Sequence, residues 1–170
     1  MKYSCAICGK RHGVYFGTNS DASIHLLELK AKSPDRVREV DGLHMVDKKK
    51  VIIPAKLSIR TEFSEDFVYQ TWVELDINVF ISYCDNFQNE VGGSIVGRLF
   101  DDLIPFFLAT RNLECLVVYR KGMSSDEHPD IHITESSELK QLQESGMSKS
   151  TVKQLMSRIH HGEDQQSISR

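Results

Sequence analysis

Apolar and polar residues alternate most regularly in the middle of the chain. Between positions 50 and 60, apolar residues occupy every second position, and polar residues fill most of the positions between them. A period of two predicts a strand with one buried face, and the apolar segment 66–75 predicts its hairpin partner. Pro54 lacks an N–H, so we expect it at a sheet edge or a bulge. The predicted buried face consists of Val51, Ile53, Ala55, Leu57 and Ile59.

Helical periodicity appears on both sides of this region. After Asp76, apolar residues recur every three or four positions, which predicts a helix that ends before Gly92. Strands and helices then follow each other in an irregular order. This order predicts an α+β fold with a mainly antiparallel sheet, packing helices and an N-terminal zinc knuckle. The other expected elements are helices at 22–31, from Ser33 to near Gly42, at 136–145 and at 148–160, and strands at 94–100, 113–119 and 130–134.

The composition is that of one folded domain. The chain has 170 residues, of which 40% are hydrophobic and 26% are charged, and these values are typical of a single globular domain. We expect residues 1–160 to form this domain, with the metal knuckle inside 1–47, and residues 161–170 to form a flexible tail. No segment approaches the ~20 apolar residues of a membrane helix, and no apolar signal segment opens the chain. The sequence therefore predicts a cytoplasmic protein without membrane contact.

The charge balance bears on the kind of partner. Lys and Arg number 21 against 24 Asp and Glu, which gives a formal net charge of −3. Nucleic-acid-binding proteins usually carry a basic excess, because neutralising phosphates supplies most of their affinity. This chain has no overall excess, so nucleic acid is not the expected partner, although the composition is compatible with a local basic patch.

A C-x-x-C pair, Cys5 and Cys8, lies close to the N-terminus. In a reducing compartment such a pair serves metal or redox chemistry more often than structural crosslinking, and no βαβ pattern supports the redox interpretation. Gly9 allows the backbone to turn and to direct an N–H at sulfur. Tetrahedral zinc takes four Cys or His ligands, so two more are required. The candidates are His12, four residues after Cys8, and His44 at a predicted strand start, with His25 as a competitor.

The two remaining cysteines and the search for catalytic motifs give no indication of an enzymatic reaction. Cys84 and Cys115 lie on the apolar faces of a predicted helix and a predicted strand, so we expect them to be core thiols. The chain contains neither a Gly-x-Ser-x-Gly nucleophile elbow nor a phosphate-binding loop. We therefore predict no catalytic residue and no organic cofactor.

The segment Cys5-x-x-Cys8-Gly9-x-x-His12 resembles the N-terminus of a bacterial family called domain of unknown function 2199. Further segments resemble the motifs of that family in the same order, over roughly residues 3–155. The family has no established activity, so the resemblance implies no reaction. The matching segments are Asp41–Asp47, Phe67 with Trp72-Val73-x-Leu75 and Phe80, Gly97-x-Leu99 with Leu103 and Pro105, Thr110 with Leu113, Pro129-x-Ile131, and Leu139 with Gln143 and Gly146-Met147-Ser148.

His44 stands where this family often has a cysteine. Both residue types donate to zinc, so the exchange is one that a retained ligand would permit. The resemblance therefore favours a single ligand set for one structural Zn²⁺ ion, made of Cys5, Cys8, His12 and His44.

These features favour a non-enzymatic binding protein. Four protein ligands leave no open position on zinc, which is typical of structural sites. We therefore expect a protein partner, for instance in an immunity-like inhibitor. The first alternative is a metal-dependent hydrolase, in which water replaces His12 or His44 and Asp41 or Asp47 acts as the base.

The second alternative is a DNA-binding regulator. Residues 139–159, with Gly146 at a turn, resemble a helix-turn-helix. However, Leu142 occupies the position where a small residue usually allows the helices to cross. The simpler interpretation is that both helices pack on the sheet through Leu139, Leu142, Val152, Leu155, Met156 and Ile159.

Overall fold

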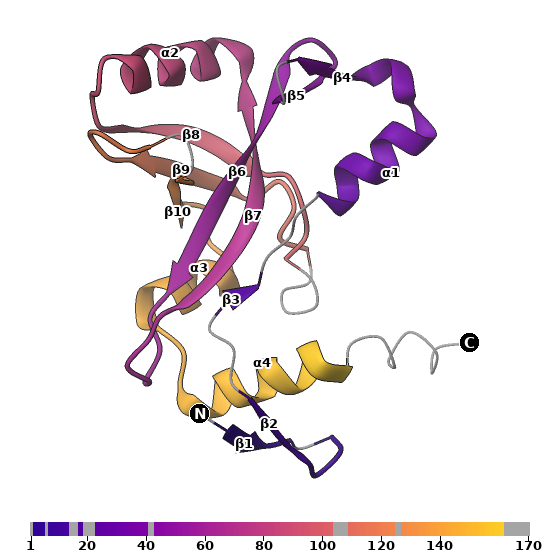
Figure 1. Ribbon diagram of the computed structural model, residues 1–170, viewed down its shortest axis with the longest axis vertical. Coiled ribbons are helices and arrows are strands. Elements are labelled where there is room, and N and C mark those ends of the chain that lie inside the picture. The colour runs from indigo at the N-terminus through magenta and orange to yellow at the C-terminus, as the bar shows by residue number, and fades with distance from the viewer. Residues whose placement is uncertain are drawn as a thin grey trace.

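Five strands in the middle of the chain close into a barrel (Figure 1). The computed structural model describes residues 2–5, 7–13, 17–18, 23–40, 43–103, 109–124 and 127–161. Each barrel strand pairs antiparallel with the next strand along the chain, and the last strand closes the ring by pairing parallel with the first. The strands are β6 (Lys50–Ile59), β7 (Phe67–Asp76), β8 (Gly93–Leu99), β9 (Glu114–Tyr119) and β10 (Asp130–Ile133).

The sequence did not predict that the sheet closes into a barrel. The α+β class is confirmed, but the sheet is a closed barrel of mixed orientation rather than simply antiparallel. In the parallel pair, Asp130 lies opposite Lys56. The Lys56 amide donates to the Pro129 carbonyl at 2.9 Å, and the Lys56 and Asp130 side chains approach to 3.5 Å. Closure depends on twist and on pairing between strands distant in sequence, which local periodicity does not encode.

The alternating pattern of β6 does predict its buried face. Val51, Ile53, Ala55, Leu57 and Ile59 are all at most 4% exposed and lie in the barrel core. Pro54, in the same strand, lies between the end of the β5 pairing at Ile52 and the start of the β10 pairing at Lys56. Backbone N–H directions alternate along a strand, so the nitrogen of Pro54 faces this gap and no ladder hydrogen bond is lost.

A smaller layer is attached to the free edge of β6. It contains α1 (Ile24–Lys32), β4 (Val37–Val40) and β5 (Leu43–Val46), while β3 (Gly17–Thr18) pairs with β7. The helix predicted from Ser33 to Gly42 is wrong after its first turn, a 3₁₀ helix at Pro34–Arg36. The chain then becomes β4, because pairing with β5 outweighs the local start signal.

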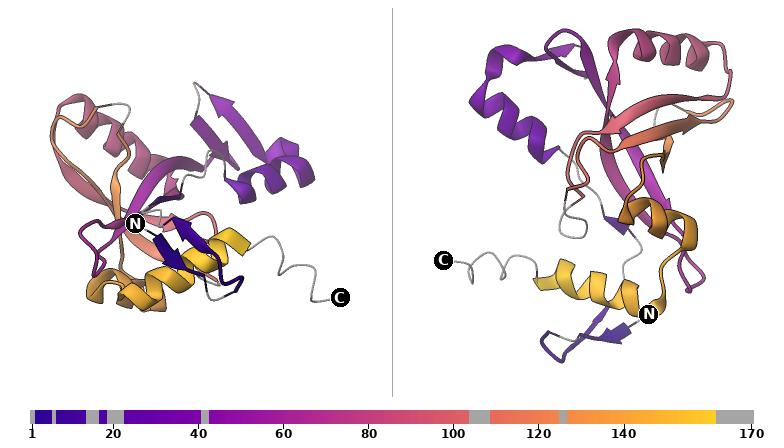
Figure 2. Two further views of the ribbon diagram at one scale, coloured as in Figure 1. Left: turned by 60° about the horizontal axis from the view of Figure 1, so that its bottom comes forward. Right: turned by 180° about the vertical axis from the view of Figure 1, so that it is seen from behind.

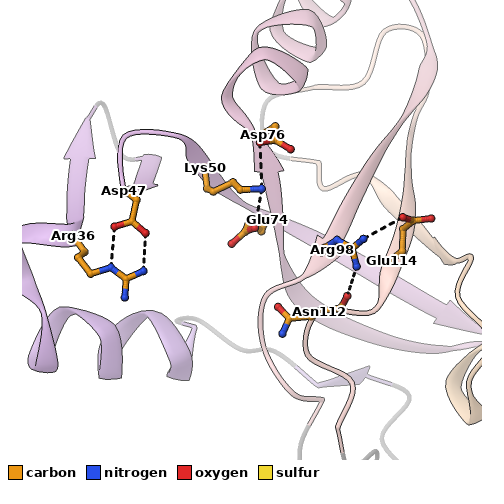
Figure 3. A network of polar contacts seen from close by, with 8 residues as sticks. All are labelled: Arg36, Asp47, Lys50, Glu74, Asp76, Arg98, Asn112 and Glu114. Atoms are coloured by element: carbon orange, nitrogen blue, oxygen red, sulfur yellow. Dashed lines mark hydrogen bonds and ion pairs between the residues drawn. The ribbon is translucent and has the colours of Figure 1, made fainter.

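Ion pairs flank the turn between β5 and β6, where the smaller layer joins the barrel (Figure 3). Arg36 donates to both carboxylate oxygens of Asp47, at 2.8 and 2.6 Å, and so joins the 3₁₀ turn to the β5–β6 turn. Lys50 reaches two acidic side chains at the end of β7, Glu74 at 3.3 Å and Asp76 at 3.2 Å. The bidentate Arg36 contact has the geometry of the stronger exposed pairs.

Helices cover both ends of the barrel (Figures 1 and 2). Helix α2 (Ile77–Gln88) lies across one end. At the other end lie α3 (Glu138–Ser145), α4 (Lys149–His161) and a hairpin of β1 (Lys2–Ser4) and β2 (Arg11–Gly13). None of the helices in the described part of the chain has the length and apolar character that a membrane span requires.

The packing predicted for the two C-terminal helices is confirmed for the described side chains. Leu139, Val152, Leu155 and Met156 belong to the same core cluster as the barrel strands, and Leu142 packs against it. The side chain of Ile159 lies outside the described residues. The apolar side of α4 is therefore already occupied by the barrel and the hairpin.

We predict that Gly97→Ala destabilises the barrel. A methyl group at this position of β8 would lie 2.5 Å from Val73 Cγ1 and 2.8 Å from Leu75 Cδ2, both of which are buried. Overpacking of this kind costs about 1–3 kcal/mol of the free energy of unfolding, measurable by urea denaturation. Val96→Ala, at an exposed neighbouring position, is the control, with a loss below about 1 kcal/mol. A Gly97→Ala protein as stable as the wild type would contradict the proposed packing.

Candidate metal centre

Four potential metal ligands converge where the N-terminal hairpin meets the end of α4. They are Cys5, Cys8, His12 and His161, and their ligand atoms all lie within 4.8 Å of one another. Cys5 Sγ is 3.3 Å from His161 Nε2, and Cys8 Sγ is 3.1 Å from His12 Nε2. The hairpin and α4 lie side by side in every view (Figures 1 and 2). Three of the four residues favoured from the sequence are therefore brought together.

The donor set fits a tetrahedral metal ion. Zinc–sulfur bonds of about 2.3 Å and zinc–nitrogen bonds of about 2.0–2.1 Å place the four donor atoms roughly 3.3–3.8 Å apart. The two sulfur–nitrogen distances here, 3.3 and 3.1 Å, are close to that spacing. Two thiolates and two imidazoles are donors that suit zinc, and two thiolates with two neutral imidazoles balance its charge.

Backbone hydrogen bonds hold the conformation of the loop that carries Cys5 and Cys8. The Gly9 amide donates to the Cys5 carbonyl and the Cys5 amide donates to the Lys10 carbonyl, both at 2.9 Å. Gly9 has φ +71°, a conformation that favours glycine. The N–H directed at sulfur comes from Ile7, 3.4 Å from Cys5 Sγ, rather than from Gly9 as the sequence suggested.

The environment of Cys5 favours its thiolate form. Cys5 is only 3% exposed, and burial opposes ionisation. Hydrogen bonds from the Ser157 side chain and the Cys8 and Ile7 backbones outweigh this effect and lower the pKa of the Cys5 thiol to about 6. Because the thiolate is the metal-binding form, such a cysteine binds a cation without first losing a proton at neutral pH.

The ligand candidate that sequence reasoning missed is His161. It lies at the last position of α4, one residue beyond the boundary expected for the folded domain, and 156 positions from Cys5. The rest of the predicted tail, 162–170, lies outside the described residues. The only signal in the sequence was a histidine at the end of a predicted amphipathic helix.

His44, the fourth ligand favoured from the sequence, does not join this cluster. It lies on β5 opposite Ile52 and Glu39, toward the other end of the molecule from the hairpin (Figure 1). Its Nδ1 atom is 3.7 Å from a Glu39 carboxylate oxygen, and its ring lies beside Trp72. Burial, followed by the charge of Lys30, lowers the pKa of His44. Pairing of β5 with β6 fixes His44 in this place.

The remaining candidates also lie elsewhere. His25 is on α1, with Nδ1 3.1 Å from a guanidinium nitrogen of Arg111. Asp47, a base in the hydrolase alternative, is held by Arg36 at the β5–β6 turn. Asp41, the other base considered, lies outside the described residues. Neither His25 nor Asp47 is among the Cys and His donors that converge at the hairpin and α4.

The other two cysteines differ in burial. Cys115 on β9 is fully buried, and burial raises the pKa of its thiol to about 12. Cys84 on α2 is partly buried, with a thiol pKa also raised by burial. Cys84 lines a cavity of about 330 Å³ between α2 and β6, together with apolar side chains that include Phe80 and Phe87. The predicted core position is therefore confirmed fully for Cys115 and partly for Cys84.

We predict that an alkylating reagent modifies the exposed and the buried cysteines at different rates. After chelation, iodoacetamide should modify the exposed Cys8 first and should leave Cys115 unmodified from pH 7 to 10. In the folded protein the pKa of Cys115, about 12, lies above the ordinary value of a thiol, so the folded state loses stability as pH rises from about 9 toward 12. Peptide mass spectrometry gives the site of modification. Reaction in guanidinium is the control, and modification of native Cys115 at pH 8 would refute its burial.

Comparison with known proteins identifies one family. No curated protein and no solved structure matches the chain. The model of the family DUF2199, described as an uncharacterised protein conserved in bacteria, matches residues 4–147. This range contains Cys5, Cys8 and His12 and ends before α4 and His161. Because the match covers most of the sequence, the chain belongs to the DUF2199 family.

Proposed function

We propose that this protein binds one structural Zn²⁺ ion through Cys5, Cys8, His12 and His161, and that it acts by binding other molecules rather than by catalysis. The observation that supports the proposal is the convergence of two sulfurs and two imidazole nitrogens within 4.8 Å. Structural zinc sites typically have four protein ligands of these types.

The surroundings of the site favour a structural over a catalytic ion. Hydrolytic zinc sites keep one position for water and place a general base beside it. Here four protein donors fill the tetrahedron, and neither the 2–13 segment nor the 149–161 segment contains an aspartate or a glutamate. A metal-bound water would find no carboxylate base in these two segments.

The site also lies at the N-terminal hairpin, a part of the fold with little stability of its own. The hairpin strands β1 and β2 have three residues each, and an isolated two-stranded hairpin is at best marginally stable in water. Tyr3 and Cys5 are buried side chains of the hairpin region, and both belong to the core cluster that also contains Val152 and Met156 of α4. A metal ion that cross-links the hairpin to α4 adds its binding free energy to folding.

The ligand assignment predicts which histidine variant loses zinc. Purified wild-type protein should contain about one zinc per chain, and His161→Ala should lose most of it because one of four ligands is missing. His44→Ala is the matched control, and it should retain the full zinc content. Metal content is measured by inductively coupled plasma mass spectrometry, with circular dichroism to check folding.

The reverse pattern would contradict the assignment. If His44→Ala lost the metal and His161→Ala kept it, the ligand set expected from the sequence would be the right one. Wild-type protein that binds no zinc, even after refolding with zinc, would overturn the proposed function itself.

A further inference from the structure

Charge is distributed very unevenly between the metal-site region and the rest of the protein. The hairpin and α4 together carry six Lys or Arg residues and no Asp or Glu, a formal charge of +6. The remainder of the chain has 15 Lys and Arg against 24 Asp and Glu, a formal charge of −9. The overall value of −3 conceals this separation. The six cationic residues, here called the basic set, are Lys2, Lys10, Arg11, Lys149, Lys153 and Arg158.

The basic set is exposed to solvent and makes no ion pair with the described residues. All six residues are exposed, and the ten ion pairs found among the described residues all involve other side chains. Within the described part of the chain, Lys149 lies near an aromatic ring, that of Phe63, at 5.8 Å from its centroid. Some cations elsewhere in the chain, such as Arg36 and Lys50, are held by carboxylates.

The fold brings these cations together from the two ends of the chain. Tyr3 is buried on the inner face of the hairpin, so Lys2 on β1 and Arg11 on β2 lie on the outer face. Lys153 and Arg158 occupy exposed positions of α4, whose buried positions include Val152 and Met156. The contact between Cys5 and His161 places the hairpin against this helix.

We propose that the basic set forms a binding surface for the phosphate backbone of a nucleic acid. This inference names the partner class for the binding function proposed above. The proposed surface depends on the metal centre in two respects only. The ion holds the hairpin on α4, and it neutralises the charge of the two thiolates. Phosphates of a nucleic acid are closely spaced single charges, and unpaired lysines and arginines gain affinity from them by releasing counterions.

Two other anionic partners fit this surface less well. Binding to a membrane surface requires an apolar helix face to insert among the lipids, but Val152, Leu155 and Met156 of α4 are buried in the protein core. A protein interface usually has an apolar or aromatic centre with few charges. The only large hydrophobic residue found exposed among the described residues of the hairpin and α4 is Ile7.

The expected mode is contact with the backbone, not reading of bases by a helix-turn-helix. Both C-terminal helices pack on the barrel core, and the cations of the hairpin lie far from the α3–α4 turn in sequence. Backbone contact predicts little dependence on nucleotide sequence and a strong dependence on salt. The acidic remainder of the protein repels phosphates and so orients the basic end toward the nucleic acid.

The test compares two variants with the same change in net charge. Lys10→Gln, Arg11→Gln, Lys153→Gln and Arg158→Gln together remove four members of the basic set. The matched control carries Arg38→Gln, Lys48→Gln, Lys49→Gln and Lys121→Gln, four exposed residues outside it that make no ion pair with the described residues. Zinc-loaded full-length proteins are titrated against fluorescein-labelled 20-nucleotide RNA and a 20-base-pair DNA duplex, from 50 to 200 mM salt.

We expect the wild type to bind at least one probe, with affinity that falls steeply as salt rises. The basic-set variant should bind at least about tenfold more weakly, and the magnitude of its log–log salt slope should be smaller by about 3, because up to four phosphate contacts are lost. The control variant should bind within about threefold of the wild type. Zinc content and thermal unfolding of both variants are measured in parallel, to separate loss of the surface from loss of the metal site.

Several results would overturn the proposal. One is the absence of binding to either probe at 20 µM protein and 50 mM salt by zinc-loaded, folded wild type. Another is equal weakening of the basic-set and control variants, because net charge and not this surface would then be responsible. Binding to anionic phospholipid vesicles without binding to either nucleic acid would assign the surface to a membrane instead. If the wild type took up no zinc and still bound nucleic acid through the basic set, the proposed metal function would fail and the nucleic-acid surface would stand.

Discussion

The contact between the N-terminal hairpin and the last turn of α4 determines how the two ends of the chain are arranged. Cys5 and His161 are 156 positions apart, yet sulfur and imidazole nitrogen lie 3.3 Å from each other. Bringing such distant residues together costs conformational entropy, and the hairpin has few buried side chains with which to offset it. The Cys and His cluster is the part of the molecule best suited to hold this arrangement, and the proposed metal supplies the binding free energy that two three-residue strands lack.

In contrast to the hairpin, the barrel is stabilised mainly by pairing between neighbouring strands and by a large buried core. Its four antiparallel pairings join strands that follow each other along the chain, and its core is closely packed around β6 and β7. It therefore supplies a rigid support on which α3 and α4 pack, and α4 in turn carries His161 to the hairpin. The arrangement also separates charge, because most of the apolar core lies in the net acidic part of the chain, whereas the hairpin and α4 carry cations and no acidic residue.

Local patterns predicted the parts of the structure that depend on local physics. Alternation located β6 and β7, the C-x-x-C spacing located the loop of the hairpin, and helical periodicity located α4 to within one residue at each end. Barrel closure, the β4 strand and His161 were not predicted, because each depends on contacts between distant segments. His44 was favoured on residue type and resemblance, but strand pairing places it beside Glu39 and Trp72. The net charge of −3 argued against an anionic partner, but it is an average over the chain. The cations of the hairpin and of α4 lie far apart in sequence, and the fold places the two segments side by side.

Hydrogen exchange followed by mass spectrometry, with and without metal, tests most directly whether the ion joins the two ends of the chain. Zinc-loaded protein is compared with protein stripped by a chelator, both at neutral pH. We expect chelation to remove protection from residues 2–13 and from the last turns of α4, because these segments lose their cross-link. Protection in β6 and β9, inside the barrel core, should remain. Identical exchange in the two segments with and without zinc would show that the ion does not join them. Loss of protection throughout the barrel with no earlier change at the ends would also contradict this role of the ion.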